Sequence, residues 1–374
     1  MKGVTKMKLR APMYYKDFHC IAENCKDSCC SAGWEIDIDS ETEKFYKNFP
    51  GEFGDKLRKN ISKNSDTIES SIHFLLDDKN NCPFLNNKKL CDIYINLGEE
   101  HLCQICKDHP RFYEWFDDIK EAGVGLCCEE AARIILSYNK NFSVYEENID
   151  DSSIISSNYN NSVNYNTGLY KYLFFARNKI INYIDNSDIP LQNKLRNVLW
   201  YGYTLQQDID NDLLDDEDIF DINSDVKNDI SSIIEYFGTL EPNDIHWPDY
   251  LKNCAKLNSE FNAKFAIFEA ENPDVENYLK NISIYFIWRY FLKGVFDGDV
   301  LSKVKLMYVS CSILKYLFFC KWLECGNLCL ENCIDIVKKY SEEVEYCEEN
   351  IIQFSDDSYE LEIFSTESLI CLFM

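Results

Sequence analysis

The stretch Cys20-Ile-Ala-Glu-Asn-Cys25-Lys-Asp-Ser-Cys29-Cys30 decides how this chain is organised, because it begins a block of closely spaced cysteines. Ten of the eighteen cysteines lie between residues 20 and 128, and none occurs in the next 125 residues. The block continues as Cys82-Pro-Phe-Leu-x5-Cys91, Cys103-x2-Cys106 and Cys127-Cys128. Thiols crowded in this way either coordinate a soft metal or oxidise to disulfides.

The compartment favours metal over disulfides. The first twelve residues are basic but are not followed by an apolar run of about 7–15 residues, so we expect no secretory signal. The later apolar stretches, 282–291 and 311–320, are shorter than the roughly 20 residues that span a bilayer. We therefore expect a cytoplasmic protein with no membrane partner, in which thiols stay reduced and are available to a metal.

The net charge of −26 limits the class of partner. Acidic residues occur throughout the chain, and no basic stripe is present to neutralise phosphates, so we expect no nucleic-acid partner. Such acidity either serves solubility or attracts a protein that presents lysines.

Three regions are expected along the chain. Residues 1–147 form the cysteine-rich part, residues 148–168 a polar Asn- and Ser-rich linker, and residues 169–374 a helical part with apolar residues at helical spacing. The low counts of glycine, 13, and proline, 8, favour long helices. The predicted fold is mainly α, with a cysteine-rich metal-binding N-terminal part packed on a multi-helix C-terminal part.

Within the third region the apolar spacing indicates particular helices. These are expected at about 226–238, 245–271, 274–296, 299–323 and 328–347. The tail from Tyr359 to Met374 is expected to be a strand or an irregular end. Cys325, Cys329 and Cys333, at i, i+4 and i+8 of one helix, would span roughly 12 Å, too far for one ion, so core packing is the expected role.

The candidate metal ligands are thiols of the first region. They are Cys25, Cys29, Cys30, Cys82, Cys91, Cys106 and Cys128. Two short pairs plus distant cysteines suit a tetrahedral zinc site or an iron–sulfur cluster, and spacing alone leaves both open. His109 and Arg111, beside these thiols, are candidates for offsetting their charge or for binding an anionic cofactor group. The sequence predicts no Gly-rich phosphate loop and no specific catalytic residue.

Four motifs resemble the flagellin lysine-N-methylase family. They are Phe18-His-Cys20-x4-Cys25-x3-Cys29-Cys30-x2-Gly33-Trp34, then Cys82-Pro-Phe-Leu…Leu90-Cys91-x-Ile93-Tyr94-x2-Leu97-Gly98-Glu99-Glu100, then Cys106-x3-Pro110-Arg111, and Cys128-x-Glu130-Ala-Ala-Arg133. The motifs cover about the first third of the chain. Part of the pattern is shared with zinc- or iron-chelating cysteine-rich proteins.

This resemblance implies methyl transfer from S-adenosylmethionine to flagellin lysines, with a 4Fe-4S cluster held by the family's cysteines. Because the family has other residues where Cys103 and Cys127 stand, it implies that neither is a ligand. The spacing of the first cysteines differs from that of the radical S-adenosylmethionine enzymes, so radical chemistry does not follow. The alternative function is a non-catalytic zinc- or iron-chelating module for protein interaction.

Overall fold

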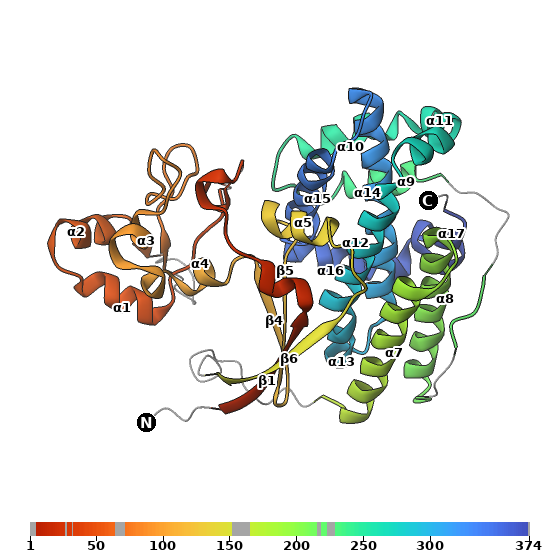
Figure 1. Ribbon diagram of the computed structural model, residues 1–374, viewed down its shortest axis with the longest axis horizontal. Helices are drawn as coiled ribbons and strands as arrows, with labels where there is room; N and C mark the ends of the chain where they lie inside the picture. The colour runs from red at the N-terminus through yellow and green to blue at the C-terminus, as the bar shows by residue number, and fades with distance from the viewer. Residues whose placement is uncertain are drawn as a thin grey trace.

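The computed structural model describes residues 5–26, 28–31, 33–63, 72–151, 165–214, 218–222 and 229–372. Two lobes are joined at a four-stranded sheet (Figure 1). The small lobe, residues 29–108, carries the first four helices, and the helical lobe carries α5 and everything from α7 onward. The expectation of a mainly α fold is confirmed.

The sheet at the junction has the strand order β4-β5-β1-β6. Its strands are β1 (Thr5–Pro12), β4 (Arg111–Phe116), β5 (Ile119–Val124) and β6 (Val144–Asp151). Strand β1 pairs in parallel with β5 and antiparallel with β6, and β4 forms a hairpin with β5. The prediction that the linker begins at residue 148 is therefore wrong, because residues 148–151 belong to β6 and pair with β1. Residues 152–164 lie outside the described residues.

The small lobe is built from short elements. They are α1 (Ser40–Asn48), α2 (Gly51–Lys59), β2 (Ile61–Lys63), β3 (Ile72–Phe74), α3 (Asp92–Leu97) and α4 (Gln104–Asp108). Asp39 caps α1 by accepting the Thr42 amide at 2.9 Å, and its other oxygen accepts the Gln104 amide at 2.9 Å. One carboxylate thus satisfies amides at the start of two helices and holds them together.

The helical lobe contains longer helices that share one core. They are α5 (Glu129–Leu136), α7 (Thr167–Asn186), α8 (Leu191–Asp210), α9 (Ser231–Phe237), α10 (Trp247–Ala255), α11 (Asn258–Glu271), α12 (Asp274–Tyr290), α13 (Gly294–Asp297), α14 (Leu301–Cys325), α15 (Leu330–Val344), α16 (Glu348–Glu360) and α17 (Thr366–Ile370). Helices occupy each expected segment, but the segment 245–271 is divided into α10 and α11, and α12 ends before α13 within 274–296. Residues 226–228 of the first segment lie outside the described residues. The described part of the tail forms helical turns rather than a strand.

The longest helix, α14, runs through the middle of this lobe. By length and composition α14 could cross a membrane. However, 78% of its most apolar 18-residue stretch is buried inside the protein. Such burial is typical of a helix at the core of a folded domain. Its last residue, Cys325, is followed by Gly326 in the left-handed region at φ 73°, which ends the helix.

The turn at Gly326 separates three cysteines that were expected to share one helix. Cys325 ends α14, whereas Cys329 stands at the start of α15 and Cys333 lies inside it. Cys325 and Cys329 are exposed and only Cys333 is buried. The expectation of core packing therefore holds for one of the three.

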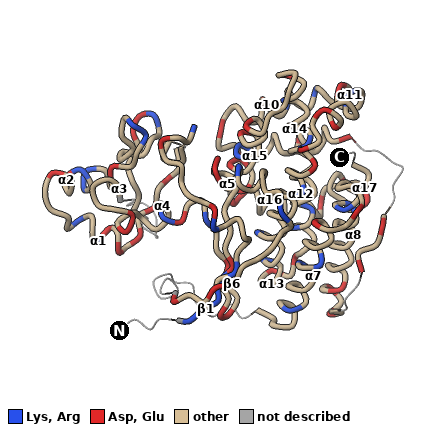
Figure 2. Tube along the Cα trace, in the orientation of Figure 1, with Lys and Arg blue, Asp and Glu red and all other residues tan. Residues whose placement is uncertain are grey.

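A buried ion cluster fixes the sheet to the helical lobe. Glu121 on β5 accepts hydrogen bonds from Arg10 on β1 at 2.7 Å and from Arg177 on α7 at 2.6 Å. The Arg177 guanidinium lies over the ring of Trp288, 4.3 Å from its centroid. Because a buried charge is costly unless paired, these contacts lock the two strands and α7 in one arrangement. Acidic and basic residues elsewhere are mixed over both lobes (Figure 2).

Candidate functional site

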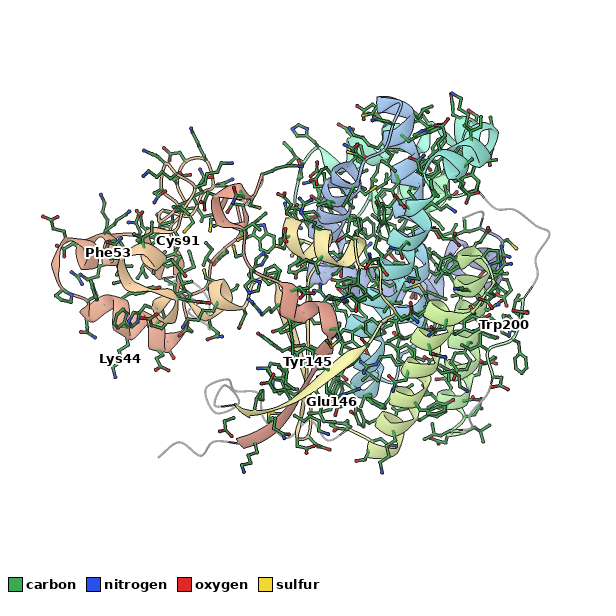
Figure 3. All side chains as sticks on the ribbon, viewed as in Figure 1. Lys44, Phe53, Cys91, Tyr145, Glu146 and Trp200 are labelled. Carbon is green, nitrogen blue, oxygen red and sulfur yellow. The ribbon has the colours of Figure 1, made fainter. Side chains whose placement is uncertain are left out.

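Four of the predicted ligand cysteines meet in the small lobe, and we call them the first thiol group: Cys30, Cys82, Cys91 and Cys106. The backbone brings the first three together, since the Cys82 amide donates to the Cys30 carbonyl at 2.8 Å and Leu85 forms a bridge with Cys91. All four belong to, or pack against, the core that contains Phe84. Cys91 lies among the side chains of this lobe (Figure 3).

The thiols of the first thiol group change one another's pKa values. Burial raises the pKa of Cys82 to about 12, and the charges of Cys30, Cys106 and Cys91 act in the same direction. Burial also raises the pKa of Cys91, with Cys30 and Cys106 contributing. A hydrogen bond with Cys103 is the largest cause of the raised pKa of Cys106. Cys30 differs, because its hydrogen bond with Cys29 lowers its pKa to about 7. The thiols of Cys82, Cys91 and Cys106 are protonated until a cation stabilises the thiolates.

A second thiol group lies where the small lobe meets α5. It contains Cys29 and Cys128, which were predicted as ligands, and Cys20, which was not. Cys25, also a predicted ligand, contacts Glu129, the residue after Cys128. The Cys25 thiol lies 3.5 Å from Glu129 Oε2, which also accepts the Lys26 amide at 2.8 Å. The charges of Cys20 and Cys128 contribute to the raised pKa of Cys29, after its hydrogen bond with Cys30. The adjacent residues Cys29 and Cys30 thus connect two separate groups.

The donor chemistry of the first thiol group fits a soft metal or an iron–sulfur cluster in kind and number. Phe84 and Leu85, which follow Cys82 in the chain, are buried and half-buried and so limit the access of water to these thiols. Across the described residues, no three Cys, His, Asp or Glu side chains stand close enough together to hold an ion. Binding would therefore require the four sulfurs to draw closer.

His109 and Arg111, predicted to bind a cofactor group, are held by aromatic rings. The His109 ring meets Trp34 edge to face, with centroids 5.3 Å apart. Burial, followed by the charge of Lys338, lowers the pKa of His109 to about 4. This lowered pKa disfavours a positive charge on His109 at neutral pH, and its role toward a cofactor stays a prediction. The Arg111 guanidinium lies 5.0 Å from the Phe18 ring centroid and donates to the Lys107 carbonyl at 3.3 Å.

A buried polar cluster lies next to this region, and we call it the Glu345 cluster: Tyr285, Arg289, Tyr290, Glu345 and Tyr346. Glu345 follows α15 and its side chain is fully buried. Its Oε2 accepts hydrogen bonds from Tyr285 at 2.8 Å and Tyr290 at 2.9 Å, and pairs with Arg289 Nη1 at 3.2 Å. Its Oε1 is buried with no hydrogen-bond partner among the described residues.

Among the buried side-chain atoms of the described residues that have no hydrogen-bond partner, Glu345 Oε1 is the only carboxylate oxygen. Leaving a buried acceptor unsatisfied costs on the order of 1–3 kcal/mol, more for a charged group, so such atoms call for an explanation. Burial raises the pKa values of Tyr285, Tyr290 and Tyr346 well above the usual range, which keeps their hydroxyls protonated as donors.

The cluster also touches the cysteine-rich part of the chain. The Tyr346 ring packs on Trp34 at 5.5 Å between centroids, and Trp34 follows the adjacent pair Cys29 and Cys30 in sequence. A Cβ added at Gly125 would lie 2.1 Å from the Tyr346 hydroxyl, so only glycine leaves room for it. The loop before α5 therefore closes directly over the cluster.

Sequence reasoning missed the Glu345 cluster. Tyr285, Arg289 and Tyr290 are the polar exceptions in the otherwise apolar stretch 284–290 of α12, which is a visible signal. Their carboxylate partner lies 55 residues beyond Tyr290, and only the packing of α12 against the end of α15 reveals it.

Residues 177–372, a little over half of the chain, match the family model described as the FliB lysine N-methylase C-terminal domain. The chain belongs to this family. The FliB match contains Tyr285, Arg289, Tyr290, Glu345 and Tyr346 and leaves the ten N-terminal cysteines outside it.

Curated relatives of this FliB-family chain come from Salmonella. A lysine-N-methylase of Salmonella typhimurium is 26% identical over 153 residues, which cover 37% of this chain and 34% of that protein. The flagellar biosynthetic protein FliU of Salmonella muenchen is 27% identical over 143 residues, which cover 37% of this chain and 80% of that protein. The chain thus spans about a third of the length of the lysine-N-methylase it matches. No solved structure matches the chain.

Proposed function

We propose that this protein is a cytoplasmic protein-lysine N-methyltransferase that transfers methyl groups from S-adenosylmethionine to flagellin lysines. The observation that carries the proposal is the FliB family match over residues 177–372. The names of the Salmonella relatives, lysine-N-methylase and flagellar biosynthetic protein, support the reaction and the flagellar substrate. The net charge of −26 suits a substrate that presents lysines.

The proposal includes a 4Fe-4S cluster held by the first thiol group, with zinc as the alternative metal. Cys30, Cys82, Cys91 and Cys106 supply the four sulfur donors that such a cluster takes. When bound, the cluster supplies a Lewis-acidic iron centre and ties separate chain segments together. The roles of Cys25, Cys29 and Cys128 as ligands, and of Arg111 and His109 toward a cofactor, stay predictions.

Methyl transfer asks three things of the chain's own residues. The target amine, with an ordinary pKa of about 10.4, has to lose its proton before it attacks. It has to be oriented toward a methyl group on a sulfonium, which S-adenosylmethionine supplies, and water has to be kept out. The Glu345 cluster offers a buried carboxylate and neutral hydroxyls, groups of the type that orient and deprotonate an amine.

The test is an assay with anaerobically purified protein, isotopically labelled S-adenosylmethionine and the flagellin of the same organism. We expect methylated lysines by peptide mass spectrometry and about four irons and four sulfides per chain, the content of one 4Fe-4S cluster. A preparation with one zinc and no sulfide that still methylates would support the enzyme and reject the cluster. Full metal content without methylation would instead favour the non-catalytic chelating module.

A further inference from the structure

We infer that the Glu345 cluster is a binding site for an alkylammonium group, whose N–H donates to Glu345 Oε1. The inference deepens the proposed function and rests on it for the source of the ligand. Two sources share this chemistry: the lysine side chain of the substrate and the α-ammonium group of S-adenosylmethionine.

The hydrogen-bond pattern around Glu345 carries the inference. Two tyrosine hydroxyls and Arg289 all converge on Oε2, while Oε1 is equally buried and has no partner among the described residues. A carboxylate oxygen is an acceptor only, so the missing partner is a hydrogen-bond donor. The hydroxyls of Tyr285 and Tyr290 are already used on Oε2, and no other donor of the described residues reaches Oε1, so we assign the missing donor to a ligand.

The surroundings favour an amine over other donors. The rings of Tyr285, Tyr290, Tyr346 and Phe112 stand within 4.9–5.9 Å of the Arg289 guanidinium, so this neighbourhood already stabilises one cation by its aromatic faces. The aliphatic stem of an alkylammonium group would contact the same rings. Arg289, Tyr346 and Trp34 keep partial exposure, so the cluster reaches the surface on the side of the cysteine-rich part.

The charges set the protonation of a bound amine. Arg289 is a fixed positive charge beside the site, and a like charge together with burial lowers the pKa of an amine. When the bound amine is a lysine, Glu345 Oε1 is the acceptor that takes its proton, and the amine becomes the free base. If the bound amine is a lysine, its nitrogen lone pair then forms a bond to the methyl carbon, the carbon–sulfur bond breaks, and its electron pair stays on the neutral thioether.

A binding experiment on the full chain tests the site without requiring turnover. The probes are a blocked lysine (N-acetyl-lysine methylamide), its norleucine analogue without the amine, and S-adenosylhomocysteine, which carries the α-ammonium group. The variant is Glu345→Gln, which keeps the shape and presents an amide. We expect at least a tenfold loss of affinity for one amine probe, and no measurable binding of the norleucine analogue to the wild type.

The affected probe identifies the source. Loss for the blocked lysine assigns the site to the substrate, and loss for S-adenosylhomocysteine assigns it to the cosubstrate. Either outcome supports an alkylammonium site. Affinities within twofold of the wild type for both probes, wild-type protein that binds neither probe, or equal binding of the norleucine analogue and blocked lysine would overturn it.

The chain offers a matched control in Glu343, which is also buried and lies two residues away. Its Oε2 accepts the Asn243 amide at 2.8 Å, and its Oε1 accepts the Asp244 amide at 3.0 Å and pairs with Lys339 at 2.9 Å. Because both oxygens have partners, Glu343→Gln should lower the melting temperature without changing probe affinity. A loss of probe affinity in Glu343→Gln equal to that in Glu345→Gln would show a general packing effect and reject the site.

Failure of this inference is separable from failure of the proposed function. Glu345-dependent binding of the blocked lysine without any methyl transfer would retain the amine site and reject the enzyme. Methyl transfer with unchanged kcat and KM in Glu345→Gln would retain the enzyme and reject the amine site.

A folded Tyr290→Phe variant tests the assignment to Oε1, because it loses one donor to Oε2 but leaves Oε1 free. It should still bind the amine probe within about fivefold of wild type. Complete loss of binding would contradict the assignment to Oε1.

Discussion

The two lobes have cores of different size and chemistry. The separate core of the small lobe contains nine buried residues, and two of them, Cys82 and Cys103, are cysteines. The core of the helical lobe is much larger and continuous from the sheet to α17, with fully buried aromatic residues such as Phe318. Since apolar burial scales with core size, the small lobe has far less to offset its chain entropy.

This difference in core size indicates that the thiols of the small lobe contribute to its stability as well as to its chemistry. Small units that cannot bury enough apolar surface are usually stabilised by a metal or a covalent cross-link. In the small lobe, Cys82 and Cys91 lie on either side of the Phe84 loop and next to Cys30. A centre held there would join segments that the small core alone holds weakly, so metal binding and folding of this lobe should be linked.

The largest effect is expected for Cys82→Ser, which removes one buried donor of the first thiol group. We expect nearly complete loss of bound metal and unfolding of the small lobe, because ligand binding free energy becomes folding free energy in such sites. Metal analysis and hydrogen exchange of residues 40–59 measure both. Cys329→Ser, at an exposed thiol at the start of α15, is the control and should keep full metal content. Equal metal content in both variants would contradict the role of Cys82.

The second prediction compares one fully buried phenylalanine in each lobe. Phe84→Ala and Phe318→Ala each should cost about 3–5 kcal/mol of unfolding free energy, the usual range for a buried phenylalanine. In the small lobe that loss should open the lobe alone, whereas in α14 it should weaken the whole helical lobe. Hydrogen exchange of 40–59 and 301–325 separates the two. If both segments exchange faster in both variants, the lobes unfold as a single unit.

The smallest effect concerns pH and His109 at the junction of the lobes. Its folded pKa of about 4 lies below the ordinary value of 6.5, so the unfolded chain binds a proton that the native chain does not between those values. Stability should therefore fall as the pH drops from about 6.5 to 4, by up to about 3.5 kcal/mol at ~1.4 kcal/mol per pH unit, and this contribution should not fall further below pH 4.

Urea unfolding at several pH values measures this slope. His109→Asn cannot titrate there and should lose that part of the pH dependence, while His246→Asn, at an exposed position, should keep it. An unchanged slope in His109→Asn would show that another group causes the pH dependence.

The sequence by itself determined the local features of this protein. Apolar spacing predicted α10, α11, α12, α14 and α15, because a helix that buries one face or all faces repeats its apolar residues at a helical period. The cysteine motifs indicated the family that the match over residues 177–372 confirms. The four strands, however, were not anticipated, because β1 and β6 are charged and pair only through contacts more than a hundred residues apart.

Tertiary structure alone decided the arrangement of the site. The division of the thiols into two groups depends on where the small lobe packs, which spacing does not encode. The neutral state of His109 follows from its burial beside Trp34 and near Lys338. The unpaired oxygen of Glu345 exists only because α12 and the end of α15 meet, since burial and pairing depend on neighbours distant in sequence.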